Sequence, residues 1–308
     1  MKSDIACVVP IFNYTGDKLL EQNHSRSLAG LKEPGVDIYS IRASQDWFPH
    51  GDWVMLVAKD VLWQKEALIN AAASRLRGDY SIIAWVDSGI LLTPSWSSRV
   101  RKQLETHDVV QCFSRGIWLT RNGTPASFRR GYVAHYLATC PGATEIPRPH
   151  GPKPSVGGAW ASRSDLWNKT NLYDRAIVGG GDTWALNGFL RVNTPEALAT
   201  RYLTPEHRRD ICHWINCVRA LALRVGYIEG EYTHLWHTPQ GQRRHSERHQ
   251  ILQSRGFDPE AHTCLVNGLV GWTPQAPTEL RDAVERYILG RSLCPEHSSQ
   301  RERQMTLF

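Results

Sequence analysis

The sequence predicts an α/β fold in which a mostly parallel sheet is flanked by helices. Residues 81–86 form an uncharged run without Gly or Pro, which is typical of a strand buried on both faces. The residues before it, 62–76, have apolar side chains at helical spacing, and Gly78 follows to end the helix. Asp87 comes where the strand ends, and open α/β sheets bind ligands at the carboxyl ends of their strands. Asp87 is therefore a candidate for ligand binding, and the alternative is an Asp that only caps the next turn.

The other elements follow in order along the chain. Pro10 is expected to close the first strand, and five prolines and four glycines in 141–158 predict a loop or a domain seam. Thr204, Pro205 and Glu206 are a helix-start signature. The predicted strands are 5–9, 36–41, 53–57, 81–86, 109–113 and 227–235, and the predicted helices are 62–76, 95–106, 182–190, 204–222, 246–253 and 278–289.

Composition indicates a globular chain of 308 residues, 41% hydrophobic and 21% charged. Seven cysteines without a CxxC pair favour a reducing compartment over a disulfide framework or a zinc knuckle. No apolar run approaches the ~18–20 residues of a membrane helix, and the N-terminus does not resemble a signal peptide. We therefore expect a cytoplasmic protein without membrane contact. Its formal net charge of +6 points to a polyanionic partner.

The order of these parts resembles glycosyltransferases of the GT-A fold, in the family 2-like branch of bacteria and phages. The segment VVPIFNY at 8–14 looks like a first-strand turn that contacts the donor nucleoside, which implies donor-binding roles for Pro10, Phe12 and Asn13. Lys65 and Asn70 match the K..ALN helix that precedes the family's DxD strand. The resemblance implies a glycosyltransferase domain over 1–260, with a donor half of about 1–115, an acceptor half of about 150–260 and a C-terminal helical extension over 261–308.

The DxD position differs from the family pattern. In such enzymes the two acids hold a divalent metal, Mn²⁺ or Mg²⁺, on the donor diphosphate. Here the triplet is Asp87, Ser88 and Gly89, so the second acid is missing. The resemblance implies metal or donor binding by Asp87 and metal binding by His234 and His237. Because alternate residues of a strand point to opposite faces, we expect one of the two histidines to be a ligand, and the alternative for each is a structural histidine.

Asp182 is the candidate general base. It follows three consecutive glycines in a stretch that resembles the family's acceptor-side segment, and glycines at that density are rarely placed for packing alone. An inverting transfer needs a carboxylate within hydrogen-bond reach of the attacking hydroxyl. The alternative is an Asp that caps the helix starting near Thr183. Trp160 and Trp184 are candidates for stacking on an acceptor ring, with core packing as the alternative.

Arg243 and Arg248 resemble the family's R.Y..R segment, and planar guanidinium groups suit a pyrophosphate. The rival interpretation is a solvated basic helix.

The acceptor is the least constrained part of the prediction. Residues 97–130 hold seven basic side chains against two acids, which favours phosphate contacts with DNA through Arg99, Arg101, Arg129 and Arg130. The preferred hypothesis is transfer from a UDP-linked sugar such as UDP-glucose to a hydroxymethylated pyrimidine in DNA, such as 5-hydroxymethylcytosine. Two alternatives stay open: assembly of a surface or lipid-linked glycan, and a module that binds nucleotide or nucleic acid without catalysis.

Overall fold

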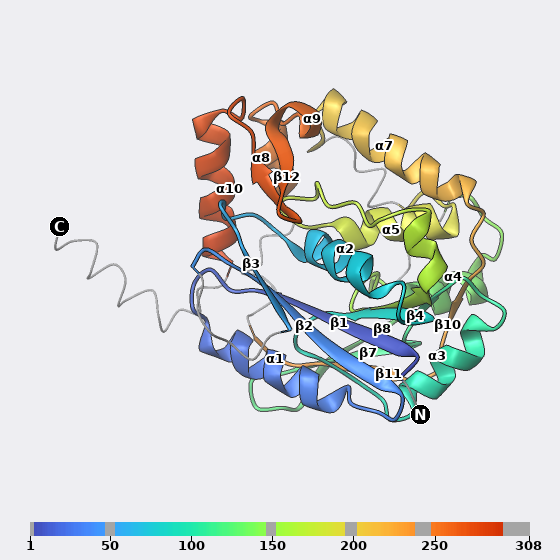
Figure 1. Cartoon of the computed structure of the whole chain (residues 1–308). Helices are drawn as coiled ribbons and strands as arrows, with labels where there is room; N and C mark the ends of the chain where they lie inside the picture. Colours follow the sequence, from blue (N-terminus) through green and yellow to red (C-terminus); the bar gives the residue numbers. More distant parts are fainter. Residues whose placement is uncertain (1–2, 47–52, 146–151, 195–201, 238–247, 292–308) are drawn as a thin grey trace.

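The computed structural model describes residues 3–46, 53–145, 152–194, 202–237 and 248–291. Its centre is a seven-stranded sheet in the order β10-β6-β9-β4-β1-β2-β3, in which only β9 runs antiparallel to its neighbours (Figure 1). The strands are β1 (Ile5–Phe12), β2 (Val36–Ser44), β3 (Val54–Val57), β4 (Ile82–Val86), β6 (Val109–Gln111), β9 (Ala159–Arg163) and β10 (Val225–Tyr227). The predicted fold class, a mostly parallel sheet with flanking helices, is confirmed.

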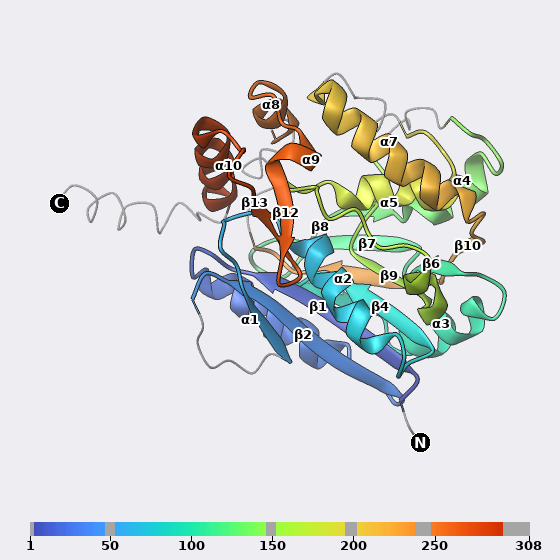
Figure 2. The same ribbon diagram turned by 45° about the horizontal axis from the view of Figure 1, so that its top comes forward.

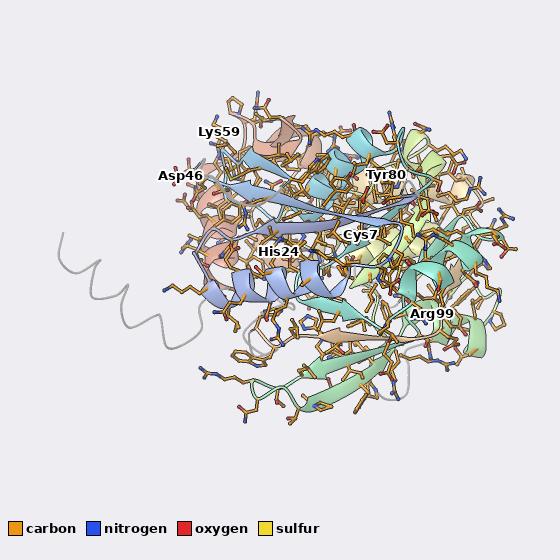
Figure 3. The ribbon with its side chains drawn as sticks, turned by 60° about the horizontal axis from the view of Figure 1, so that its bottom comes forward. Cys7, His24, Asp46, Lys59, Tyr80 and Arg99 are labelled. Atoms are coloured by element: carbon orange, nitrogen blue, oxygen red, sulfur yellow. The ribbon has the colours of Figure 1, made fainter. Side chains whose placement is uncertain are left out.

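Both faces of this sheet are covered, as the uncharged β4 sequence predicts. Ala6 and Val8 of β1 pack in the cluster under helix α2 (Lys65–Leu76), whereas Cys7 and Val9 pack in the cluster on the opposite face. Helices α1 (Lys18–Gly30) and α3 (Trp96–Leu104) cover that second face (Figure 2). Figure 3 turns this side forward and shows α1, which carries His24, beside the strands. The alternation along β1 therefore fixes two hydrophobic layers.

A second, four-stranded sheet has the order β5-β11-β7-β8. Its strands are β5 (Ile90–Leu92), β11 (Glu231–His234), β7 (Arg115–Leu119) and β8 (Pro125–Arg130). The remaining helices are α4 (Tyr132–Thr139), the 3₁₀ turn η1 (Ser164–Asn168), α5 (Gly181–Leu190), α7 (Pro205–Ala220), α8 (Arg248–Gln253), α9 (Pro259–His262) and α10 (Thr278–Gly290). None of the described helices is both long and apolar enough to cross a bilayer.

Two predicted strand boundaries are wrong. β1 does not stop at Pro10 but continues to Phe12. It pairs with β4 only as far as Val8, so Pro10 lies where the strand has a partner on one side alone, and a proline is tolerated there as at a sheet edge. The strand predicted at 227–235 is two strands, β10 and β11, which belong to different sheets and are separated at Gly230, where φ is +141°.

The C-terminal extension packs against the segment that leads into α2. It contains a hairpin, β12 (Thr263–Val266) and β13 (Leu269–Trp272), besides the predicted helix. The Gln64 side chain donates to the Val270 carbonyl at 2.7 Å and accepts from its amide at 3.0 Å. One hydrophobic cluster joins Leu62 and Ala67 to Leu280 and Val284 of α10. The extension therefore fixes the chain next to Lys65.

Candidate active site

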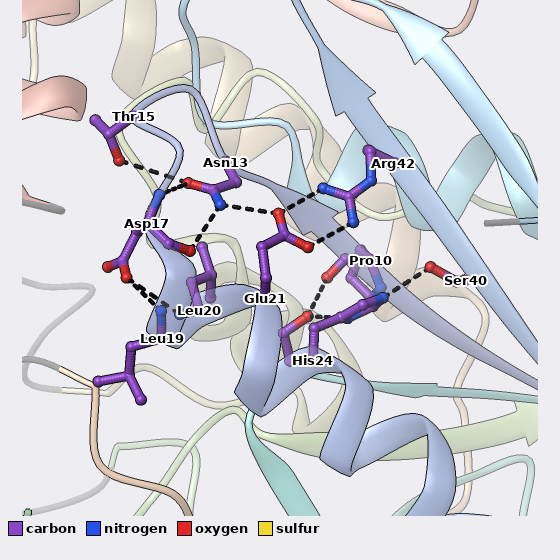
Figure 4. A network of polar contacts seen from close by, with 11 residues as sticks. Pro10, Asn13, Thr15, Asp17, Leu19, Leu20, Glu21, His24, Ser40 and Arg42 are labelled. Carbon is purple, nitrogen blue, oxygen red and sulfur yellow. Dashed lines mark hydrogen bonds and ion pairs between the residues drawn. The ribbon is translucent and has the colours of Figure 1, made fainter. Parts of the chain in front are cut away.

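The turn after β4 is held by α1. The Ser88 hydroxyl donates to the Pro10 carbonyl at 2.8 Å and lies 2.8 Å from His24 Nδ1, while His24 Nε2 lies 2.8 Å from the Ser40 hydroxyl. Figure 4 shows His24 of α1 between Pro10 and Ser40. The Gly89 amide donates to the Ser27 hydroxyl at 2.8 Å. These bonds fix the backbone on which Asp87 is presented at the carboxyl end of β4.

The missing second acid of the DxD pattern has a structural reason. Gly89 has φ +85°, a backbone conformation that residues other than glycine rarely adopt. A Cβ atom there would have the Asn23 Cβ of α1 as its neighbour, at 3.8 Å. Position 89 therefore faces α1, and Asp87 is the one acid of the triplet.

Lys65 joins Asp182, the predicted general base, to Asp87, the predicted donor or metal ligand. It is the first residue of α2, and only 7% of its side chain is exposed. Its Nζ lies 2.7 Å from Asp87 Oδ1 and 2.8 and 2.9 Å from the two oxygens of Asp182. Asp87 and Asp182 thus converge, although they are far apart in the sequence. They share one ammonium group instead of facing each other across open space.

Burial and neighbouring charges have opposite effects on the pKa of Lys65. Burial alone would lower the pKa of Lys65, but the carboxylates of Asp182 and Asp87 raise it above its usual value, so the ammonium stays charged. Burial raises the pKa of the neighbouring Glu66 to about 8, with Lys65 opposing the rise and Asp182 adding to it. Glu66 therefore carries a proton over much of the neutral range.

Replacing Glu66 with Gln should stabilise the protein at pH 8 and change little at pH 5. The folded-state pKa of Glu66 lies above its unfolded value of ~4.5, so the folded protein binds the extra proton. Stability from this group is present below pH ~4.5 and is lost as the pH rises through about 8. Urea unfolding at several pH values measures the effect, with exposed Glu285→Gln as the control. Equal pH dependence in parent and Glu66→Gln would contradict a protonated Glu66.

Asp182 lies in the first turn of α5, where the positive end of the helix dipole stabilises a carboxylate. Gly179 and Gly180 before it have φ of +84° and +114°. A Cβ atom on Gly181 would lie 2.2 Å from Glu66 Oε1, so this position accepts no larger residue without movement of Glu66. The triple glycine thus lets α5 begin directly against α2, which brings Asp182 to Lys65.

A cavity of about 200 Å³ opens beside this group. One part of its wall is aromatic and includes Phe12 and Trp63, whose rings meet edge to face at 5.0 Å. Residues from distant parts of the chain complete the wall: Pro10, Ile11, Tyr14, Thr15, Asp17, Leu20, Lys65, Asp87, Ser88, His234, His237, Ile288 and Arg291. Pro10, Phe12, Lys65 and Asp87, which were predicted to bind the donor, all line this cavity.

The two histidines are on the same side, contrary to the expectation from strand alternation. Both line the cavity, and their ring centroids are 5.2 Å apart. β11 ends at His234, so the strand rule does not extend to His237. His234 stacks on Trp118 at 5.9 Å, and its Nδ1 lies 2.8 Å from the Leu235 carbonyl.

The described residues do not fit a metal centre as they stand. Nowhere in that part of the chain do three His, Cys, Asp or Glu side chains converge closely enough to hold an ion. One oxygen of Asp87 already lies against Lys65, and Gly89 supplies no second carboxylate. We derive no step through a metal for this reason.

Several predicted site residues have structural roles instead. The Asn13 amide donates to the Asp17 carbonyl and to Glu21, which also accepts two bonds from the buried Arg42 (Figure 4). The Asn70 amide donates to the Leu172 carbonyl at 2.9 Å and accepts from the Leu172 amide at 2.9 Å. These two asparagines tie loops to helices and do not line the cavity.

The predicted acceptor tryptophans are buried. Trp160 is 3% exposed, donates to the Val156 carbonyl and packs against Phe189. Trp184 is 5% exposed and packs with Tyr173 and Ile211. Both lie in the core, so neither presents a ring to an acceptor here, and the core-packing alternative describes them.

The four predicted acceptor arginines do not form one surface. Arg101 pairs with Asp4 at 2.7 Å, at the amino end of β1 and away from the carboxyl ends that carry the site. Arg99 donates to the Thr93 and Pro94 carbonyls. Arg129 and Arg130 belong to β8 of the second sheet, where Arg129 lies over the Trp118 ring at 4.7 Å and Arg130 borders an open hollow.

Of the predicted pyrophosphate pair, Arg248 lies beside the glycine turn that precedes Asp182 and is not among the residues that line the cavity, and Arg243 lies outside the described residues. Arg248 begins α8, and Gly179 and Gly180 run along its guanidinium group. Burial lowers its pKa from the usual value.

Sequence analysis missed Trp63, Glu66 and Arg291. Glu66 and Trp63 flank Lys65 in the chain, and the Trp63 indole donates to Glu66 at 3.0 Å. A charged residue next to the lysine that was predicted to bind the donor was the available signal. Arg291 follows the Gly290 that was expected to end the last helix, and only the packing of α10 reveals that it reaches the cavity.

The fold is mixed α/β: a mostly parallel seven-stranded sheet flanked by helices, with Asp87 at a strand end, and a second, four-stranded sheet. Neither a protein-family model nor a curated protein matches the sequence. It is similar to the solved structure of a putative nucleotide-diphospho-sugar transferase from Desulfovibrio desulfuricans G20, with 11% identity, a TM-score of 0.33, and 75% of this chain and 82% of that one covered.

Two further structures are similar at 12% identity. For the catalytic domain of Drosophila beta1,4galactosyltransferase 7, in complex with xylobiose, the TM-score is 0.39. The alignment covers 87% of this chain and 91% of that one. Glucosyl-3-phosphoglycerate synthase from Mycobacterium tuberculosis, in complex with Mn²⁺, UDP and phosphoglyceric acid, has a TM-score of 0.41, with coverages of 88% and 87%. The activity of this chain therefore has to be argued from its own side chains.

Proposed function

We propose that the protein is a glycosyltransferase that uses a nucleotide-sugar donor, with UDP-linked sugars as the first candidates. The observation that supports this most is the meeting of Asp87 and Asp182 on Lys65, at the edge of a cavity with an aromatic wall. A module that only binds nucleotides has no use for a second carboxylate, 28% exposed, next to the ligand-binding turn.

The three residues have different roles in the proposed reaction. Asp182 accepts the proton of the acceptor hydroxyl as that oxygen attacks the anomeric carbon, and the bond from this carbon to the diphosphate breaks. Asp87 binds hydroxyl groups of the donor at the end of β4. Lys65 orients both carboxylates and touches no reacting atom, so it is a positioning residue.

For the acceptor we propose a hydroxymethylated pyrimidine in DNA. The support is the group of basic residues on the second sheet, where Arg115, Arg129 and Arg130 lie with Phe128, whose side chain is half exposed, around an open hollow of about 380 Å³. Phosphates would contact the arginines and a base would stack on the Phe128 ring. The alternative acceptor is a glycan, and the acceptor screen described next distinguishes the two.

The test is a donor and acceptor screen. We expect slow release of nucleoside diphosphate from one nucleotide sugar in water, and at least ~10-fold faster release with the correct acceptor, since a positioned nucleophile replaces water. Acceptors include duplex DNA with 5-hydroxymethylcytosine, the same duplex with cytosine, and free saccharides, each with and without Mn²⁺. Asp87→Asn should raise the Kd of the accepted donor about 10-fold, whereas Asp165→Asn, on the surface, should not. Nucleotide binding without release from any donor would favour the non-catalytic alternative.

A further inference from the structure

The last described residue, Arg291, reaches the donor cavity from the C-terminal extension. It caps α10 with helical backbone angles, and its guanidinium carbon lies 4.7 Å above the Trp63 ring and 5.6 Å from the Tyr287 ring. Nη1 donates to the Tyr287 hydroxyl at 3.1 Å. Two aromatic rings and one hydrogen bond therefore hold the charge at the wall of the cavity.

The charge balance around the cavity singles out this residue. The positive charge of Lys65 is matched by two carboxylates, Asp87 and Asp182. Arg291 has no carboxylate partner among the residues that the structure describes. A dianionic or trianionic ligand in this cavity needs positive charge, and Arg291 supplies it without breaking an ion pair.

The geometry also suits the ligand. A guanidinium group has five N–H donors in one plane, and one of them is used on Tyr287. The other N–H groups stay available for hydrogen bonds beside the Trp63 contact, and two parallel N–H groups match two oxygens of a phosphate. A bare lysine ammonium would give charge but not this pairing.

We propose that Arg291 binds the diphosphate of the nucleotide donor, so that the C-terminal extension is part of the donor site. This inference rests on the proposed function, which it extends by naming the group that recognises the phosphates. The aromatic part of the wall, Phe12 and Trp63, is then left for the nucleoside, and Asp87 for the sugar end.

Calorimetric titration of UDP and of uridine into the parent protein and Arg291→Gln tests the proposal. We expect the Kd for UDP to rise at least ~10-fold and the Kd for uridine to change less than ~2-fold, because a charge-assisted contact to phosphate is lost and the nucleoside contacts remain. Arg291→Lys should recover only part of the UDP affinity. Arg286→Gln, an exposed arginine on the same helix, is the matched control and should bind as the parent does.

The readouts separate this inference from a purely structural role and from the proposed function. A residue that only ties α10 to Trp63 would weaken UDP and uridine binding alike, which would overturn the inference. Unchanged UDP affinity in Arg291→Gln, with or without Mn²⁺, would also overturn it. UDP binding that depends on Arg291 without any sugar transfer would sustain the inference and refute the proposed function. Transfer that proceeds with a normal donor KM in Arg291→Gln would refute the inference and sustain the proposed function. A parent protein that binds no UDP would refute both.

Discussion

Asp182→Asn is expected to lower the rate of glycosyl transfer by ~10²–10⁴, the usual contribution of a positioned general base. The amide keeps the size of the side chain and one acceptor oxygen for Lys65, but it cannot take a proton from the acceptor hydroxyl. Donor binding should change little, since the base acts on the acceptor. A steady-state assay gives the loss in kcat, and calorimetry gives the Kd of the donor diphosphate.

The control for this prediction is Asp165→Asn. Asp165 is half exposed and pairs with Lys169 on the surface, so its loss should leave transfer unchanged. A transfer rate in Asp182→Asn within ~3-fold of the parent would exclude a general base at this position, where ~10² or more is expected. Asp182 would then be only an ion-pair partner of Lys65 in the first turn of α5; the predicted capping role is wrong, because α5 begins at Gly181 and its N-cap residue is Gly180.

Lys65→Met should both destabilise the protein and abolish transfer. The substitution leaves Asp87 and Asp182 close together with no cation between them, next to Glu66. Removing one partner of a buried ion pair typically costs ~3–5 kcal/mol. Activity should fall with stability, because repulsion between the two carboxylates moves or protonates one of them. Urea unfolding at pH 7 gives the free energy of unfolding.

A double variant separates charge from packing. If repulsion is the cause, Lys65→Met with Asp182→Asn should recover part of the stability lost in Lys65→Met. The surface variant Lys169→Met, which removes an exposed partner of Asp165, should cost no more than ~1 kcal/mol. A Lys65→Met protein as stable as the parent would mean that the two carboxylates do not share this lysine in solution.

The central sheet could be predicted from the sequence because its strands are buried on both faces. The run 81–86 and the helix before it are local patterns, and β4 and α2 appear where these patterns predict them. The second sheet could not be predicted from the sequence. β11 pairs with β5 and β7, which are more than 110 residues earlier in the chain, and no local pattern records that pairing. α1 was missed because its buried face holds Asn23, His24 and Ser27, which read as polar.

The same difference applies to the site. Asp87 and Asp182 were found because each follows a local signal, a strand end in one case and three glycines in the other. Lys65 was predicted for donor binding, but its contact with both acids depends on where α2 and α5 meet. Trp160 and Asn70 have residue types that suit binding, yet their burial is decided by neighbours distant in the chain. The position of Arg291 at the cavity depends on how the whole C-terminal extension packs, so no local pattern predicts it.

A crystal structure with an intact nucleotide-sugar analogue and an acceptor tests the central claim most directly. We expect the diphosphate in the cavity beside Arg291, the sugar at Asp87, and the acceptor hydroxyl within ~2.6–3.2 Å of an Asp182 oxygen on the face opposite the diphosphate. A nucleotide bound elsewhere would contradict it. So would an acceptor hydroxyl that Asp182 cannot reach while Lys65 still bridges both carboxylates.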